Sequence, residues 1–356
     1  MTYNWTIIGY NVAGLMVVLA ALLILRPYRV SRPVTAIIVL VPCLAVLSFV
    51  GALFSPIDFF GKLQLLAWAF FVHFTLFLVG SAYLLFRQRK GIAVVCATLA
   101  LAVVLVGIYA FFVEPYRLEV TRFASSVWKL KTPVRIAIVA DIQTEAPGPY
   151  EEGALRKVQA AKPDLILFLG DYVQVIGRER YTEACESFNK MLHKVNLQAP
   201  LGIHAVGGNV DRANIARWYF SGLNVKCFER THAVDLGPLV LTGLSWEDSL
   251  DKRLSVGPQK KFHIVFGHHP NFSLGRVEAD LLLAGHTHGG QVRLPFVGPI
   301  LTLSRVPRSW AGGETVLAPN RKLIVSRGIG MERGNAPQMR FLCRPEIVIV
   351  DLLPAQ

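Results

Sequence analysis

The sequence is short of cysteine, and the few cysteines it has are not spaced as pairs. It contains five in 356 residues, with no Cys-x-x-Cys, whereas zinc fingers and disulfide-stapled domains depend on such pairs or on a denser framework. Two of the five lie in strongly apolar segments, which leaves an odd number, Cys185, Cys227 and Cys343, for the rest of the chain. These counts argue against a disulfide framework and against a thiolate zinc site.

Charged residues are almost absent from the first third of the chain. Up to residue 113 there are seven Lys/Arg and one acidic residue, although the whole chain carries 37 and 24 and has a mean hydropathy of +0.44. Four apolar runs in this part, over residues 5–25, 34–54, 63–86 and 92–113, each approach the roughly 20 residues that a helix needs to cross a bilayer. A soluble helical bundle would show a polar face, and a signal peptide would be a single run with a cleavage pattern. The sequence therefore predicts an all-α region of four transmembrane helices.

The orientation of these spans follows from their short loops. Lys and Arg accumulate in cytoplasmic loops, and the first and third loops hold six: Arg26, Arg29, Arg32, Arg87, Arg89 and Lys90. The second loop has only Lys62 against Asp58, and the amino terminus has no Lys or Arg side chain. We therefore expect an integral, multi-pass protein of the plasma or inner membrane, with everything after the fourth span extracytoplasmic.

The remainder of the chain lacks internal repeats, low-complexity segments, a helix-turn-helix signature and an interleaved basic and aromatic stripe. Its moderate basic excess therefore favours a membrane surface or an anionic substrate over nucleic acid. We expect a membrane domain over residues 1–113, a linker, stalk or first edge strand over 114–132, and a folded domain over 133–356. No feature of the sequence indicates the oligomeric state.

Short runs of Val, Ile and Leu alternate with amphipathic stretches in the folded part. Residues 150–162 have apolar positions three to four apart, which predicts a helix. Apolar runs of four to eight residues predict strands over residues 134–141, 164–171, 202–209, 239–246, 262–269, 280–288, 323–330 and 346–353. The alternation is typical of an α/β domain with a β-rich second half.

Several of these strands end in a side chain that can bind a metal, next to glycine or another small residue. The residues are Asp141, Asp171, Asn209, His268, His286 and His288. Taken singly, an Asp can be a helix cap and an Asn a turn residue, but the repeated position favours a shared site at the carboxyl ends of the strands. Carboxylate, amide and imidazole donors suit borderline ions such as Mn, Fe or Zn. His269 follows His268 directly, so we expect it to point away from that site.

The strand-end motifs, "AD", "GD", "GGNVD", "GHH" and "GHTH", together with "SRGIG" and "PEIVIVDL" further on, resemble those of the calcineurin-like metallophosphoesterase superfamily, in particular a membrane-associated bacterial branch. The likeness covers about two thirds of the chain. It implies a four-layer α/β/β/α sandwich of two mixed sheets and two divalent metal ions. By the resemblance, Asp141, Asp171 and His288 hold the first metal, Asp171, Asn209, His268 and His286 hold the second, and Asp171 bridges the two.

Two positions depart from the family pattern. Gln143 stands where the family has the His of Asp-x-His, and an amide oxygen ligates more weakly than imidazole and prefers harder ions. Val210 stands where the family has the His of Gly-Asn-His, which usually acts as general acid, and valine cannot donate a proton.

The resemblance implies a membrane-anchored, metal-dependent phosphoesterase. It would hydrolyse a phosphodiester or pyrophosphate bond, in a phosphorylated and lipid-linked substrate, by a metal-activated water. Asp171, Asn209 and His286 are the expected catalytic residues. The alternative, motivated by Gln143 and Val210, is a catalytically degenerate domain that binds a phosphorylated ligand as a membrane sensor or scaffold.

Overall fold

The computed structural model describes residues 2–26 and 32–355, and the chain divides into two compact units. One comprises Met1–Phe111 with Asn335–Gln338, and the other Phe112–Gly334 with Met339–Gln356. Arg29, part of the first predicted cytoplasmic loop, lies outside the described residues.

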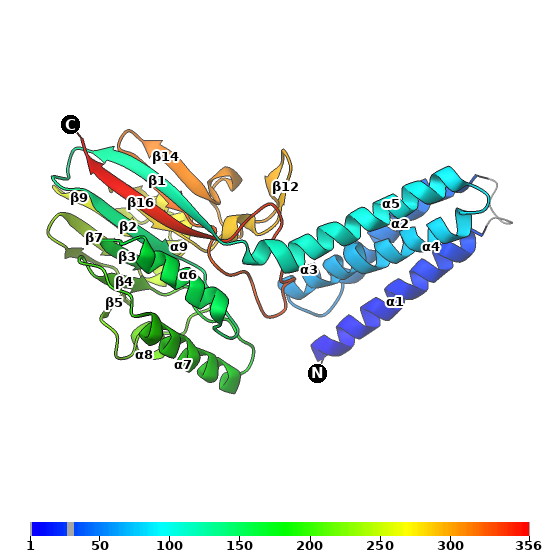
Figure 1. Cartoon of the computed structure of the whole chain (residues 1–356), viewed down its shortest axis with the longest axis horizontal. Helices are drawn as coiled ribbons and strands as arrows, with labels where there is room; N and C mark the ends of the chain where they lie inside the picture. The colour runs from blue at the N-terminus through cyan, green and yellow to red at the C-terminus, as the bar shows by residue number, and fades with distance from the viewer. Residues whose placement is uncertain (1, 27–31, 356) are drawn as a thin grey trace. The chain divides into compact units, whose positions relative to one another are not determined.

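The first unit is helical (Figure 1). Its elements are α1 Thr2–Ile24, α2 Pro33–Leu53, α3 Phe59–Trp68, the π-helical η1 Ala69–Phe74, α4 Thr75–Leu85 and α5 Lys90–Ile108. The π-helical η2 Tyr109–Val113 continues α5 across the boundary at Phe111. Because α3, η1 and α4 are continuous, the described residues hold four apolar helices, of 22, 21, 27 and 27 residues. Each is long enough to cross a hydrocarbon layer of about 30 Å. Their outward side chains, such as Leu19, Ile38 and Leu101, are apolar and exposed, as expected of a surface that faces lipid.

The second unit is built on two six-stranded mixed sheets. The first contains β1 Glu119–Val127, β2 Val134–Val139, β3 Leu165–Phe168, β4 Ile203–Val206, β5 Val225–Phe228 and β16 Glu346–Pro354, in the order β1-β16-β2-β3-β4-β5. Strands β2 to β5 are parallel, and β16 runs antiparallel to β2.

The second sheet contains β6 His232–Asp235, β7 Leu239–Gly243, β9 Phe262–Phe266, β11 Leu281–Ala284, β14 Gly313–Ala318 and β15 Arg321–Val325, in the order β14-β15-β11-β9-β7-β6. Its four central strands are parallel and its two edge strands antiparallel. Two small pairs complete the strands: β8 Ser255–Val256 with β10 Arg276–Val277, and β12 Arg293–Leu294 with β13 Gly298–Pro299.

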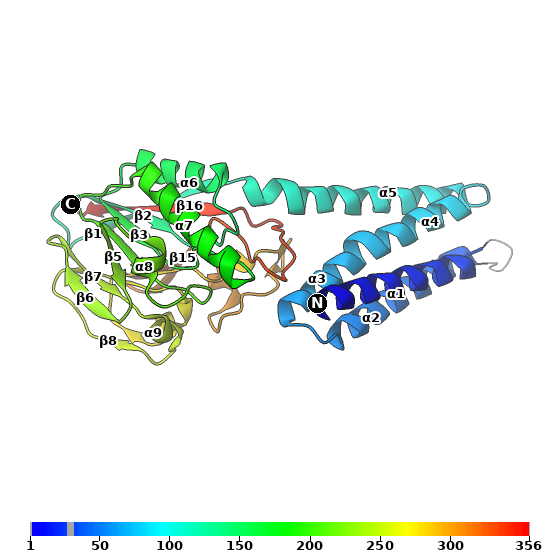
Figure 2. The same cartoon turned by 90° about the horizontal axis from the view of Figure 1, so that it is seen from below.

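The two sheets pack face to face, and helices cover their outer faces (Figure 2). Successive side chains of β2 point to opposite faces of the first sheet, and both faces are buried. Ile136 and Ile138 join the core between the sheets, whereas Ala137 and Val139 pack toward the helices. The helices on the first sheet are α6 Pro149–Ala160, α7 Arg178–Val195 and α8 Ile215–Tyr219. The second sheet is covered by α9 Trp246–Leu250 and the 3₁₀ turn η4 Pro270–Leu274. The predicted α/β/β/α architecture, preceded by four apolar helices, is confirmed.

Residues 114–132 are more ordered than a linker. The 3₁₀ turn η3 Glu114–Tyr116 leads into β1, which pairs with β16 over nine residues as the edge strand of the first sheet. Of the alternatives that the sequence left open, the edge strand is the one that forms. The alternating exposed and half-buried residues of β1 are those of a strand with one face in contact with the domain, and its partner β16 is more than 200 residues away in sequence.

Candidate active site

The donor side chains follow the carboxyl ends of central strands in both sheets. Asp141 and Asp171 follow β2 and β3, Asn209 follows β4, His268 follows β9, and His286 and His288 follow β11. Five of the seven predicted ligands have a left-handed backbone, with φ between 36° and 68°: Asp141, Gln143, Asp171, His286 and His288. That conformation costs a non-glycine residue about 1–3 kcal/mol and is concentrated at functional sites.

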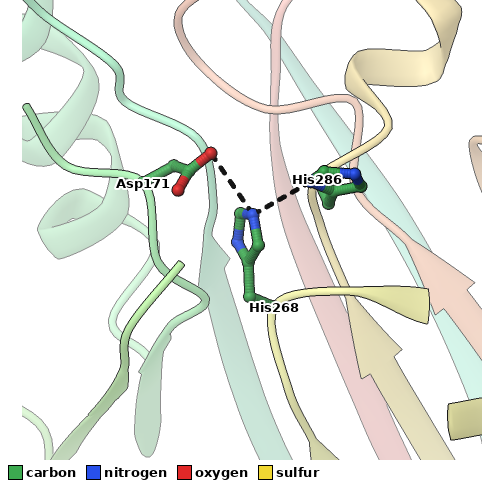
Figure 3. A group of neighbouring side chains, drawn as sticks. All are labelled: Asp171, His268 and His286. Atoms are coloured by element: carbon green, nitrogen blue, oxygen red, sulfur yellow. Dashed lines mark hydrogen bonds and ion pairs between the residues drawn. The ribbon is translucent and has the colours of Figure 1, made fainter. Parts of the chain in front are cut away.

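Four of these side chains form a tight cluster. The ligand atoms of Asp171, His268 and His286 lie within 4.8 Å of one another (Figure 3). His268 Nε2 lies 3.3 Å from an Asp171 oxygen and 3.2 Å from Asn209 Oδ1, and His286 Nδ1 lies 2.9 Å from the same Asn209 oxygen. An arrangement in which a carboxylate, an amide oxygen and two imidazole nitrogens face one another is that of a cation site.

The imidazole tautomers in the cluster follow from their outer contacts. His268 Nδ1 donates to the Leu169 carbonyl at 2.7 Å, and His286 Nε2 faces the Leu303 carbonyl at 3.4 Å. With the outer nitrogen of each ring protonated toward a carbonyl, the inner nitrogen is the one that would direct a lone pair to a cation in the cluster, as metal-binding histidines require.

The pKa values reflect the negative charge of the cluster. Burial lowers the pKa of His268, but attraction and hydrogen bonding to Asp171, attraction to Asp141 and the hydrogen bond to Leu169 together raise it to about 9. Burial raises the pKa of Asp141 to about 7, against the attraction of His268. The carboxylates thus favour a protonated, positively charged imidazole at His268. A cation bound in the cluster would supply this positive charge in place of the proton.

Of the remaining predicted ligands, Asp141 and Gln143 contact this cluster. Asp141 accepts hydrogen bonds from the His286 backbone N–H at 2.9 and 3.2 Å, and Gln143 Nε2 lies 3.3 Å from Asp171. Gln143 Oε1 and His288 Nε2 are buried and have no hydrogen-bond partner among the described residues. Buried polar atoms are rarely left unsatisfied, and both atoms are metal donors, so the residues present fit a metal at this first site as well as at the second.

Two glycines show how closely the backbone is packed around these carboxylates. A Cβ at Gly208 would lie 2.1 Å from an Asp171 oxygen, and one at Gly328 would lie 2.6 Å from the Asp141 Cβ. Gly328 also has a φ of +73°. Any side chain at either position would displace a carboxylate of the site.

Comparison with known proteins agrees with this geometry. A family model described as calcineurin-like phosphoesterase matches residues 134–290. An uncharacterized metallophosphoesterase of Aquifex aeolicus is 30% identical over 279 residues, which cover 70% of this chain and 97% of the relative. The chain belongs to the calcineurin-like phosphoesterase family. Members of the family are metal-dependent, so the protein is a metallophosphoesterase and a hydrolase.

Two relatives have more specific names. The phosphodiesterase YaeI of Escherichia coli is 26% identical over 260 residues, covering 69% of this chain and 92% of the relative. The UDP-2,3-diacylglucosamine pyrophosphatase LpxG of Chlamydia muridarum is 24% identical over 335 residues, covering 74% of this chain and 98% of the relative.

The metallophosphoesterase site depends on two further residues that the sequence did not reveal. Asp211 accepts hydrogen bonds from the backbone N–H groups of Asp171, Tyr172 and Gly208 at 2.7–2.9 Å. Arg340 is fully buried and donates to the carbonyls of Arg327, Gly330 and Cys343. Asp211 is the last residue of the "GGNVD" motif, two positions after Asn209, and could have been predicted from that motif. Arg340 has no local signal, because its acceptors are brought together only by the fold.

His269 lies beside the cluster, so the prediction that it points away from the site is wrong. Its ring packs against His286 at a centroid distance of 4.1 Å and against Trp246 at 6.1 Å. Its Nδ1 accepts from the Asn271 N–H, and its Nε2 faces the Leu303 carbonyl at 3.4 Å. Burial, with the charge of His268, lowers the pKa of His269 to about 4, so it is neutral and a poor proton donor at neutral pH.

Proposed function

We propose that this metallophosphoesterase hydrolyses a phosphodiester or pyrophosphate bond in a phosphorylated, lipid-linked substrate. The observation that carries the proposal is the cluster of Asp171, Asn209, His268 and His286, together with the buried, unsatisfied donor atoms of Gln143 and His288. Two ions of the Mn, Fe or Zn class would be held, the first by Asp141, Gln143, Asp171 and His288. The second would be held by Asp171, Asn209, His268 and His286.

When bound, such ions supply Lewis-acid polarisation of the phosphoryl oxygens and an activated water. The protein groups orient this centre. Leu169 and Leu303 fix the His268 and His286 tautomers through their carbonyls, and the Val210 N–H holds an Asp171 oxygen at 3.0 Å. The residues proposed as catalytic are Asp171, Asn209 and His286, which surround His268 in the cluster.

The substrate class is supported by the relatives and by the apolar helices. The names of the YaeI and LpxG relatives refer to phosphodiesters and to the pyrophosphate of a diacylated sugar nucleotide. A lipid-linked substrate would remain in the bilayer that the four helices are long enough to cross. Metal analysis of the purified full-length protein, combined with a hydrolysis screen over phosphodiesters, pyrophosphate-linked lipids and phosphomonoesters, tests this proposal. A chain that binds metal and phosphorylated ligand but cleaves none of these would instead be a membrane sensor or scaffold.

We further propose that the catalytic domain is extracytoplasmic, on the basis of the Lys/Arg excess in the first and third loops. Ser255 is exposed on β8 and Gln88 is exposed between the third and fourth spans. In a background without Cys43 and Cys227, Ser255→Cys is expected to react with an impermeant thiol reagent in intact cells. Gln88→Cys is expected to react only after the membrane is opened. The reverse pattern would contradict the proposed orientation.

A further inference from the structure

A carboxylate outside the family motifs lies against Gln143. Glu332 follows the second-sheet strand β15 on a loop, and its backbone N–H donates to Gln291 Oε1 at 2.8 Å. One of its carboxylate oxygens accepts from Gln174 Nε2, and the other lies 3.4 Å from Gln143 Nε2. Glu332 is therefore held by hydrogen bonds at its backbone and at its carboxylate, and the carboxylate is directed toward Gln143, which replaces the family's histidine.

The amide of Gln143 is fixed between two carboxylates. Its Nε2 lies 3.3 Å from Asp171 Oδ2 and 3.4 Å from Glu332 Oε2, so each amide hydrogen has an acceptor. Its Oε1 is buried and has no partner. A carboxylate that accepts from the donor end of a ligand fixes its orientation and raises its basicity, as in carboxylate–histidine–metal triads.

We propose that Glu332 belongs to the first metal site, where it orients Gln143 so that the amide oxygen remains for the metal and adds a third negative charge beside Asp141 and Asp171. The inference rests on the proposed metal binding and extends it. It also narrows the class of cation. A first site made of carboxylate and amide oxygens with one imidazole suits a harder ion, Mn²⁺ in preference to Zn²⁺.

The test is metal titration of the full-length protein after metal removal, with Mn²⁺ and Zn²⁺ in separate arms. The parent is expected to bind two ions in unequal steps. Glu332→Gln keeps the size of the side chain. It is expected to lower the affinity of the weaker binding step, that of the first site, about 10- to 100-fold, and more for Mn²⁺ than for Zn²⁺. The affinity of the tighter step should not change. Glu186→Gln, which removes an exposed carboxylate from α7, is the matched control and should change neither step.

Two further measurements separate this role from a structural one. Gln143→His in the Glu332→Gln background is expected to restore the weaker step for Zn²⁺, because imidazole donates more charge than an amide. The metal-free Glu332→Gln protein should unfold at the same temperature as the parent or higher, since one of three crowded carboxylates is gone. Unchanged binding steps, or equal weakening of both steps with a lower unfolding temperature, would overturn the proposal. Since binding is read without substrate, failure to hydrolyse any substrate would overturn the proposed function alone.

Discussion

Replacing Asp171 with Asn is expected to abolish hydrolysis and to lower the bound metal. The Asp171 carboxylate contacts residues of both proposed metal sites: its Oδ2 lies 3.3 Å from His268 Nε2 and 3.3 Å from Gln143 Nε2. Asparagine keeps the shape but removes the charge that would bridge the two ions. We expect turnover to fall by at least about 10³-fold, or about 4 kcal/mol of activation free energy.

The measurements are turnover and metal content of the same preparation. Asp235→Asn serves as the control, because Asp235 is exposed on β6 and its carboxylate contacts Lys261 and the backbone N–H of Gly237, neither of which belongs to the cluster. Burial raises the pKa of Asp171, but attraction to His268 and the hydrogen bonds from His268 and the Val210 N–H together lower it, so the loss should hold across neutral pH. A variant with near-normal turnover and full metal content would show that Asp171 does not bridge two ions.

The second large effect concerns the leaving group. The backbone N–H of Val210 holds Asp171, but its side chain cannot donate a proton. The imidazole of His269, which packs against His286, has both nitrogens directed at backbone groups. An alkyl phosphomonoester leaves as an alkoxide that needs a proton, whereas a pyrophosphate releases a phosphate that needs none. General acid catalysis is worth 10²- to 10⁴-fold, so we expect pyrophosphate-linked and aryl phosphodiester substrates to be preferred by about that factor.

Turnover on a pyrophosphate-linked lipid, an aryl phosphodiester and glycerol phosphate measures this preference. Val210→His should reduce the difference in turnover between these substrates by raising the rate on glycerol phosphate. Val210→Leu keeps the side chain apolar and should leave the difference as it is. Equal rates on leaving groups of very different pKa in the parent protein would contradict the argument.

Much of the fold and of the donor set could be predicted from the sequence, because both depend on neighbouring residues. Apolar runs of about 20 residues specify apolar helices whatever surrounds them, and all four are confirmed. An apolar strand that stops at Gly-Asp or Gly-His-x-His places its donor at a strand end, and the strands do end there. The family resemblance is confirmed by the comparisons. The roles of the seven residues as ligands stay predictions.

The tertiary structure alone decided which distant residues complete the site. Glu332 meets Gln143 across 189 positions, and Arg340 meets the carbonyl of His288 across 52. The residues next to Glu332 and Arg340 in sequence do not indicate a role in the site. A lone Glu or Arg in a loop is usually solvated, so the sequence favours that interpretation. The pairing of β1 with β16 is likewise non-local. The sequence by itself determined the apolar helices, the strand ends and the donor types, since these follow from local composition and covalent order. The sheet partners, the imidazole tautomers and the carboxylate behind Gln143 follow from packing, because each depends on groups that only the folded chain brings within hydrogen-bond distance.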